Sequence, residues 1–212
     1  QRVANLADVI AERHGGVDIV ISNAAARISP QLAPAEQVAN FVDTNNHGTS
    51  RMIRAFLPIL NDGARFVVVA SSFGSLRNLP PELHHHFDVE RASLEEIETT
   101  MDAYVQLAQA DRAGEAGWPD WINVPSKIGQ VAALKVLARM LRPVAQERDI
   151  LVNAACPGLV DTDASRPWFA DMSAAQSPDE AAVDVVWLAT LPPGTREPYG
   201  ELIQHRRIIP WM

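Results

Sequence analysis

Short apolar runs alternate along the chain with segments in which apolar residues recur every three or four positions. The short runs have the length and composition of strands buried in a parallel sheet, and the periodic segments those of amphipathic helices. Strands separated by helices predict an α/β fold with a doubly wound parallel, Rossmann-like sheet. The predicted strands are 17–22, 64–72, 150–158 and 200–204, and the predicted helices lie within 1–16, 38–60, 93–109 and 126–148, with a last helix opening at 177.

Two of these helices carry explicit start signals. Ser177, Pro178 and Glu180 fit the N-cap, the first helical position and the capping glutamate of the last helix. Ser93 and Glu96 form the same capping box for helix 93–109, which lies inside a long insertion at about 73–120. Its apolar residues form one stripe that must be buried. They are Leu94, Ile97, Met101, Tyr104 and Ala108.

Composition limits the kind of protein this is. A chain of 212 residues with 47% hydrophobic residues suits one domain over 1–212. The net charge of -8 argues against nucleic acid and anionic membranes as partners. No apolar run approaches the roughly 20 residues of a membrane span, and no signal peptide opens the chain. The single cysteine, Cys156, suits a reducing compartment, so we expect a cytoplasmic protein.

Ligands of doubly wound folds bind beyond the carboxyl ends of the strands. The segments at those positions, 23–26, 71–75 and 157–163, are all rich in small or polar residues. Each alone is equally compatible with a loop that merely turns. Together they mark the expected site.

Five short motifs at these positions and on the helices between them occur in a fixed order. They are "SNAA" at 22–25, "DTNNHGT" at 43–49, "VVVASS" at 67–72, "SKIG" at 126–129 and "CPGLVDT" at 156–162. Each motif is weak alone, whereas five in the right order are specific. On these residues the chain resembles the short-chain dehydrogenase/reductase family. The segments "PELHHHF", "GWP" and "LATLPP" add a resemblance to its monomeric carbonyl reductase branch.

The resemblance implies roles for individual residues. Ser72 would bind the substrate carbonyl, Asn45 would open its helix and hold a water on a proton relay, and Lys127 would bind the nicotinamide ribose and lower the pKa of a neighbouring acid. It also implies NADP or NAD as cofactor, with NADP favoured, a small-molecule carbonyl substrate and a monomer. Besides Lys127, the cofactor residues would be Asn23, Ala24, Ala25, Pro157, Gly158, Val160 and Thr162.

The first departure from the family pattern is Asn123. The family has a tyrosine four residues before its lysine, and here that position is asparagine. A carboxamide has no proton to give near neutral pH, although it can donate a hydrogen bond to a carbonyl. A general acid contributes roughly 10² to 10⁴ in rate. The departure predicts a slow reductase, a silent relative that binds a ligand or partner, or a non-redox enzyme using the same pocket.

The second departure is that the family's glycine-rich turn does not occur in these 212 residues. The turn and the first strands of the dinucleotide half would precede Gln1. Without them the strand at 17–22 becomes an apolar sheet edge. We expect either a further N-terminal part or another cover for this edge.

The remaining candidates have ordinary structural explanations. His84, His85 and His86 lack the spacing of a metal site and are interpreted as part of a solvated loop, so no metal is expected. Cys156 is interpreted as a residue in the middle of a buried strand. Trp168, Phe169 and Met172 are compatible with a lid over substrate and equally with plain packing.

Overall fold

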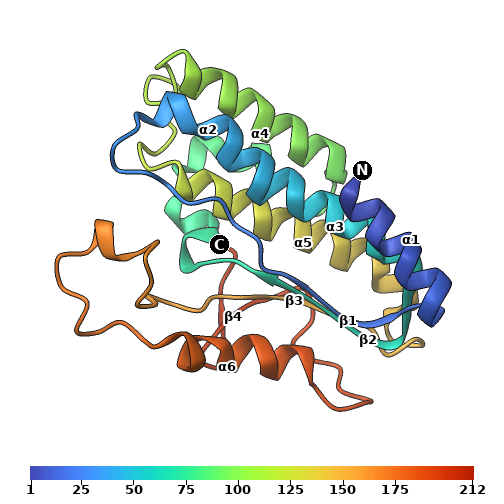
Figure 1. Ribbon diagram of the computed structural model, residues 1–212. Helices are drawn as coiled ribbons and strands as arrows, with labels where there is room; N and C mark the ends of the chain where they lie inside the picture. Colours follow the sequence, from blue (N-terminus) through green and yellow to red (C-terminus); the bar gives the residue numbers. More distant parts are fainter.

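The computed structural model describes residues 1–212 as one five-stranded sheet between two layers of helices (Figure 1). The strands lie in the order β1-β2-β3-β4-β5, with the first four parallel and β5 antiparallel to β4. Their bounds are β1 Val17–Ser22, β2 Leu60–Val69, β3 Leu151–Ala155, β4 Leu202–Gln204 and β5 Arg207–Ile209. The predicted doubly wound α/β fold is confirmed.

Five helices cover one face of the sheet, and α6, Pro178–Ala189, covers the other (Figure 1). The five are α1 Arg2–His14, α2 Pro34–Val42, α3 Gly48–Phe56, α4 Leu94–Gln109 and α5 Asn123–Ala145. A π-helical turn, Asp43–His47, joins α2 to α3. Short 3-10 turns lie at Leu57–Ile59, Ser72–Gly74, Leu76–Asn78, Pro81–Phe87 and Arg166–Trp168.

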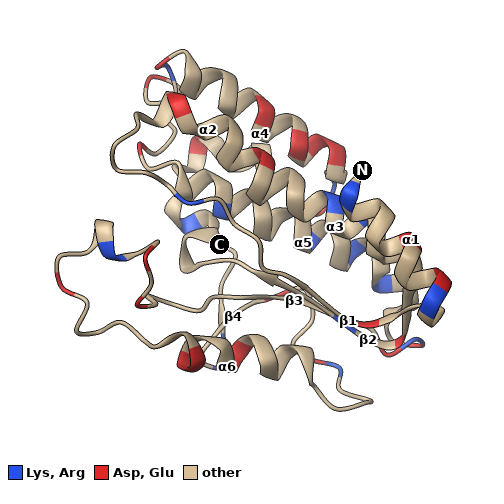
Figure 2. Cartoon of the chain, in the orientation of Figure 1, with Lys and Arg blue, Asp and Glu red and all other residues tan.

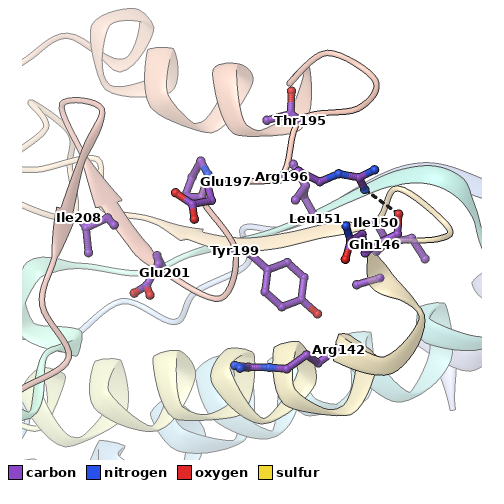
Figure 3. A pocket seen from close by; sticks show the side chains of 12 residues that line it. Arg142, Gln146, Ile150, Leu151, Thr195, Arg196, Glu197, Tyr199, Glu201 and Ile208 are labelled. Atoms are coloured by element: carbon purple, nitrogen blue, oxygen red, sulfur yellow. Dashed lines mark hydrogen bonds between the residues drawn. The ribbon is translucent and has the colours of Figure 1, made fainter.

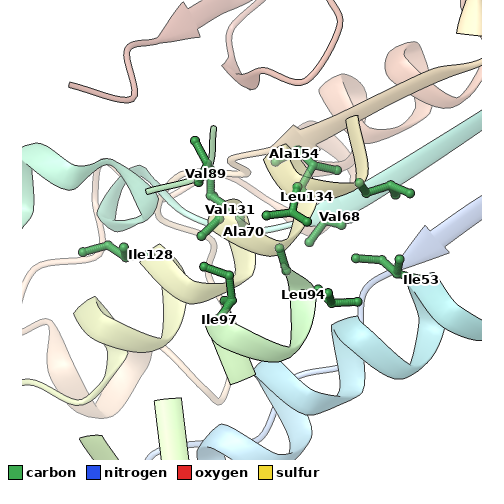
Figure 4. Close-up of a cluster of buried hydrophobic side chains, with 14 of the residues drawn as sticks. Ile53, Val68, Ala70, Val89, Leu94, Ile97, Ile128, Val131, Leu134 and Ala154 are labelled. Carbon is green, nitrogen blue, oxygen red and sulfur yellow. The ribbon is translucent and has the colours of Figure 1, made fainter. Parts of the chain in front are cut away.

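Helix α5 lies at the centre of the core. Ile128, Val131 and Leu134 are fully buried on α5 and lie with Val68 of β2 and Ala154 of β3 in one hydrophobic cluster (Figure 4). Burying one such aliphatic side chain stabilises the fold by roughly 1.5–3 kcal/mol. The helix that carries Lys127 is therefore held rigidly against the sheet.

Helix α4 forms as the sequence predicts. Ser93 Oγ accepts from the N–H of Glu96 at 3.1 Å, and a Glu96 carboxylate oxygen accepts from the N–H of Ser93 at 2.6 Å, which completes the capping box. All five residues of the predicted stripe are buried, and α4 packs against α2 and α5. Its stripe is therefore covered by this chain.

Strand β1 is the edge of the sheet, as expected. Val20 points into the core, whereas Ile19 and Ile21 are 46% and 40% exposed. The exposed pair makes an apolar strip along this edge. On α1, Ala7 is buried between the partly buried Val3 and Ile10, whereas Leu6 is exposed.

Several predicted boundaries are wrong. Strand β2 begins at Leu60, which pairs with Val17, although the Asn-Asp-Gly sequence after it resembles a turn and the register shifts there. It ends at Val69, so Ser71 and Ser72 lie beyond it. Helix α5 begins at Asn123 rather than Ser126 and ends at Ala145. Cys156 follows the last residue of β3 instead of lying within the strand, although it is buried.

Charged residues are distributed over both helical layers. Figure 2 shows Asp and Glu on α2, α4 and α6, Lys and Arg on α3 and α5, and both kinds on α1. None of the helices combines the length and the apolar character that a bilayer crossing requires.

Candidate active site

A cavity of about 440 Å³ opens beyond the carboxyl ends of the strands. Its walls come from the loop after β1, the turn after β2, the start of α5 and the loop after β3. Both Ser72 and Asn123 line this cavity. The seventeen lining residues are Ala26, Arg27, Ile28, Ser71, Ser72, Phe73, Trp121, Asn123, Gly158, Leu159, Val160, Thr162, Ala164, Ser165, Trp168, Phe169 and Gln204.

Gly74 fixes where Ser72 stands relative to α5. Ser72 begins a 3-10 turn that ends at Gly74 and packs directly on α5. A Cβ atom at Gly74 would lie 2.5 Å from Val131 Cγ2 and 3.0 Å from the carbonyl oxygen of Lys127. Only glycine allows this approach. The sequence analysis did not identify this role of Gly74, although "SFGS" places a glycine next to the serine motif.

Asn123 and Lys127 lie one turn apart on the same face of α5. Asn123 is the first helical residue and is partly exposed, and its carboxamide has no hydrogen-bond partner within the protein. Lys127 is buried, and its ammonium donates one hydrogen bond, to Gln130 Oε1 at 2.8 Å. An ammonium has three hydrogens, so two remain for a ligand.

Burial lowers the pKa of Lys127 to about 8, an effect that the nearby Cys156 sulfur partly opposes. Burial also raises the pKa of the Cys156 thiol, against the lowering effect of Lys127 and of contacts with Gly158 and Ser72. At pH 7 the ammonium is therefore mostly charged and the thiol neutral.

Hydrogen bonds connect Lys127 to the turn that carries Asn45. Gln130 Nε2 donates to Thr49 Oγ1 at 3.1 Å, and Thr49 donates to the backbone oxygen of Asn45 at 2.7 Å. This oxygen thus has a protein donor, whereas the resemblance implied a water held by Asn45. An amide side chain does not transfer protons, so the chain positions Lys127 and does not supply it with protons.

The π-helical turn at Asp43–His47 is the local helix opening that the resemblance implied for Asn45. Asn45 is buried, and its side-chain oxygen accepts from the N–H of Ala26 at 2.9 Å. Asn46 Nδ2 donates to the Ser126 carbonyl at 2.8 Å. The turn therefore joins the loop after β1 to α5.

Aromatic rings form the outer wall of the cavity. Phe73 meets Trp121 edge-on at 5.0 Å between ring centroids, and Trp121 lies 6.4 Å from Trp168. Phe169 completes this wall, whereas Met172 does not line the cavity. The buried indole N–H of Trp121 has no partner within the protein.

The cofactor residues implied by the resemblance divide into two groups. Gly158, Val160 and Thr162 line the cavity, with Gly158 at φ 77°. Asn23, Ala24 and Ala25 are exposed at the end of β1, and Pro157, like them, lies outside the lining. Lys127 also lies outside the lining, one turn from Asn123 along α5, so Gly158, Val160 and Thr162 are the implied cofactor residues that reach the cavity.

The three consecutive histidines are interpreted from the sequence as part of a solvated loop, but two of them pack against other residues of the insertion. They lie in the 3-10 turn Pro81–Phe87. His84 Nε2 lies 2.9 Å from the carbonyl oxygen of Leu79, and His86 stacks on Trp118 at 5.8 Å between ring centroids. Burial lowers the pKa of His86. These side chains help to pack the insertion.

A second cavity, of about 470 Å³, lies at the opposite ends of the strands, near the end of α5 (Figure 3). The Tyr199 hydroxyl donates to the Ala138 carbonyl at 2.7 Å, and Arg196 donates to the Gln146 carbonyl at 2.6 Å. Two of its polar side chains are thus engaged within the protein, and the cavity lies away from the carboxyl ends of the strands. The cavity that contains Ser72 and Asn123 is the better candidate site.

Comparisons with known proteins agree with the fold and the motifs. A family model described as enoyl-(acyl carrier protein) reductase matches residues 1–101. The chain is 32% identical to carbonyl reductase [NADPH] 1 of Rattus norvegicus over 100% of the chain and 76% of that protein. It is 31% identical to the Homo sapiens protein of the same name, with the same coverage.

Solved structures of low identity share the fold. Salutaridine reductase from Papaver somniferum has a TM-score of 0.78 at 22% identity, covering 95% of this chain and 77% of its own. A short-chain dehydrogenase from Burkholderia cenocepacia in complex with NADP has a TM-score of 0.59 at 22% identity, covering 95% and 69%. With the carbonyl reductase relatives, these matches show that the chain belongs to the short-chain dehydrogenase/reductase family.

Proposed function

We propose that this protein is an NADP(H)-dependent oxidoreductase that reduces a ketone or aldehyde slowly, because Asn123 stands where the family has its acid. The observation that carries the proposal is that Ser72 and Asn123 line one cavity, with the buried Lys127 one turn from Asn123 along α5. The names of the carbonyl reductase relatives support the preference for NADPH.

Lys127 and the loops at the carboxyl ends of the strands would hold the cofactor, which supplies the hydride when bound. The two free ammonium hydrogens of Lys127 would bind the ribose hydroxyls. Gly158, Val160 and Thr162 would lie along the nicotinamide, with Asn23, Ala24 and Ala25 on the side of β1.

Ser72 and Asn123 would each donate a hydrogen bond to the substrate carbonyl. Lys127 would stabilise the negative charge that develops on its oxygen, because a fixed cation in a buried site acts more strongly than in water. Asn123 has no proton to transfer, so the proton would come from water in the cavity. The reaction would then be slow, since a positioned general acid contributes roughly 10² to 10⁴ in rate.

The test is reduction of a generic ketone or quinone by protein expressed from its complete gene. NADPH oxidation should match alcohol formation one to one, and Ser72→Ala should lower kcat/KM by roughly 10- to 100-fold, the effect of losing one hydrogen bond to the reacting oxygen. Ser173→Ala, at an exposed serine of a nearby loop, is the control and should leave kcat/KM unchanged. No alcohol formation by the native protein would contradict the proposal.

The unpaired carboxamide of Asn123 supports a second candidate, non-redox chemistry at a carbonyl polarised by Ser72 and Asn123. A silent relative that only binds a ligand or partner is the third. NADPH binding without consumption, together with turnover of an enolisable ketone by proton exchange, would favour the second. Binding of a ligand without any turnover would favour the third.

We also propose that the protein is a monomer. Helix α4 packs against α2 and α5. The family resemblance implies that dimers would pair through α3 and α5, beside this helix. A second subunit would have to displace a helix whose stripe is already buried. Light scattering after size exclusion should give the mass of one chain, and a dimer formed through α3 and α5 would contradict the proposal.

A further inference from the structure

Arg27 is the only charged residue among the seventeen that line the candidate active site. It lies in the loop after β1, and the next residue of that loop, Ile28, lines the same cavity. The other lining residues are apolar, aromatic or uncharged polar. A ligand in this cavity therefore meets one cation on its wall.

The guanidinium of Arg27 has no partner within the protein. It forms no ion pair, no side-chain hydrogen bond and no stacking contact with an aromatic ring, and the residue is exposed. Arg166, on the loop across the cavity, is the opposite case, because it is 2.7 Å from both Asp161 and Asp163. The acidic groups of that loop are thereby engaged, and Arg27 stays free to bind an anion.

The surroundings of Arg27 indicate what kind of anion fits. The cavity holds about 440 Å³ and has a wall of Phe73, Trp121, Trp168 and Phe169. Such a wall accepts a flat aromatic body by stacking and edge contacts. A guanidinium pairs best with a planar carboxylate through two parallel hydrogen bonds.

We propose that the substrates of this site are aromatic carbonyl compounds that carry a carboxylate, with Arg27 as the residue that selects the carboxylate. This inference rests on the proposed function for the carbonyl end, which would lie at Ser72 and Asn123. The aromatic body would lie against the tryptophan wall, and the carboxylate would reach Arg27.

The charge of the whole chain makes this selection testable. With a net charge of -8, the average field of the protein repels anions. At an ionic strength of 0.1 M the screening length is about 10 Å, so distant charges have little effect and a cation on the cavity wall dominates. A preference for the anion would therefore have a local cause.

The experiment compares 4-acetylbenzoate with 4-acetylbenzamide, which has the same shape and no charge. Protein expressed from its complete gene is studied as native, Arg27→Gln, Arg27→Lys and Arg13→Gln, at constant ionic strength. Dissociation constants are measured by calorimetry in the presence of NADP⁺, and kcat/KM with saturating NADPH. The ratio between native and variant cancels the different intrinsic reactivities of the two ketones.

We expect the native preference for the acid over the amide to fall by about tenfold in Arg27→Gln, as for loss of one charge-assisted hydrogen bond at a partly solvated site. Arg27→Lys should retain part of this preference, since lysine keeps the positive charge but cannot form the two parallel hydrogen bonds of a guanidinium. Arg13→Gln should keep all of it, because Arg13 is an exposed arginine without a partner in the last turn of α1 and does not line the cavity. Because Arg27 has no partner in the protein, none of its variants should lose stability.

Each other result is decisive. An equal preference in native protein and Arg27→Gln, or no binding of either ketone, overturns the proposal. A loss of NADPH affinity in Arg27→Gln without a change in the acid-to-amide ratio also overturns it and assigns Arg27 to the cofactor. Anion-selective binding without reduction supports this inference and contradicts the proposed reductase. Reduction of both ketones without selectivity supports the proposed reductase and contradicts this inference.

Discussion

The ammonium of Lys127 donates to Gln130 Oε1 at 2.8 Å, and Gln130 lies one turn further along α5. This bond gives a buried cation a neutral acceptor in place of a carboxylate. Gln130 in turn donates to Thr49, so its side chain is held from both ends. A neutral acceptor fixes the position of the ammonium without neutralising its charge, which leaves the charge available to a ligand.

The buried cation should reduce the stability of the fold at neutral pH. Burial lowers the pKa of Lys127 from 10.5 to about 8. Below pH 8 the ammonium is charged in both states and the folded state bears the full cost of desolvation. Between about pH 8 and 10.5 the unfolded chain binds more protons, so the free energy of unfolding rises with pH. Lys127→Met should therefore be more stable than native at pH 7, by about 1–3 kcal/mol.

Urea unfolding at pH 7 and at pH 10 checks this prediction. The difference between Lys127→Met and native should shrink at the higher pH. Lys135→Met is the control, because Lys135 donates to the Gly200 carbonyl at 2.9 Å and lies 3.3 Å from a Glu201 carboxylate oxygen. It should gain no stability at pH 7. If Lys127→Met is less stable than native protein at pH 7, the buried ammonium of Lys127 does not destabilise the folded state.

Reductase activity should depend on the same proton. If the charge of Lys127 stabilises the developing oxyanion, kcat/KM should be high below pH 8 and fall as the pH rises through about 8. The measurement is a pH profile of kcat/KM with NADPH saturating. Gln130→Glu places a carboxylate next to the ammonium, which favours its charged form, and should move the fall to higher pH. A profile that is flat from pH 6 to 9 would exclude a role for this charge.

Gly74 should be sensitive to the smallest substitution. An added methyl group would lie 2.5 Å from Val131 Cγ2 and would separate the Ser72 turn from α5. Gly74→Ala should cost about 1–3 kcal/mol in the free energy of unfolding and lower kcat/KM. Gly48→Ala is the control, because its nearest neighbour, the Asp43 carbonyl oxygen, is at an ordinary 3.7 Å. It should be neutral or stabilise α3.

Features encoded by local pattern could be predicted from the sequence. The strand at 17–22 and helix α4 have the predicted bounds within a residue, because an apolar run and a capping box are local signals. The order of the five motifs places Ser72 and Asn123 at one cavity. The parallel topology makes this possible, since it collects the carboxyl ends of the strands at one edge.

Features that depend on tertiary contacts could not be predicted. Strand β5 is a hairpin partner of β4 that turns at His205 and Arg206, both at positive φ, with no glycine or asparagine to mark the turn. The contact between Gln130 and Thr49 joins residues 81 positions apart. The absence of a partner for Arg27 depends on which side chains surround it in the folded protein, and the sequence pattern does not predict that.

The replacement of Asn123 by tyrosine tests the central departure from the family. The structure places Asn123 at the first position of an unbroken α5, with Lys127 one turn below and Ser72 on the same cavity wall. A phenol there would lie near a cation that lowers its pKa and would supply the proton that Asn123 lacks. Carbonyl reduction by Asn123→Tyr should exceed that of native protein by roughly 10² to 10⁴.

We expect the lower end of this range for a geometric reason. Pro125 lies in the first turn of α5, where its missing N–H costs no helical bond, but its ring restricts the preceding residues. Displacement of the phenol by about 1 Å would cost on the order of 10² in rate. Asn123→Gln, which is larger but has no acid, is the control and should not gain activity. If Asn123→Tyr binds NADPH normally and still reduces ketones no faster than native protein, the site is built for chemistry other than hydride transfer.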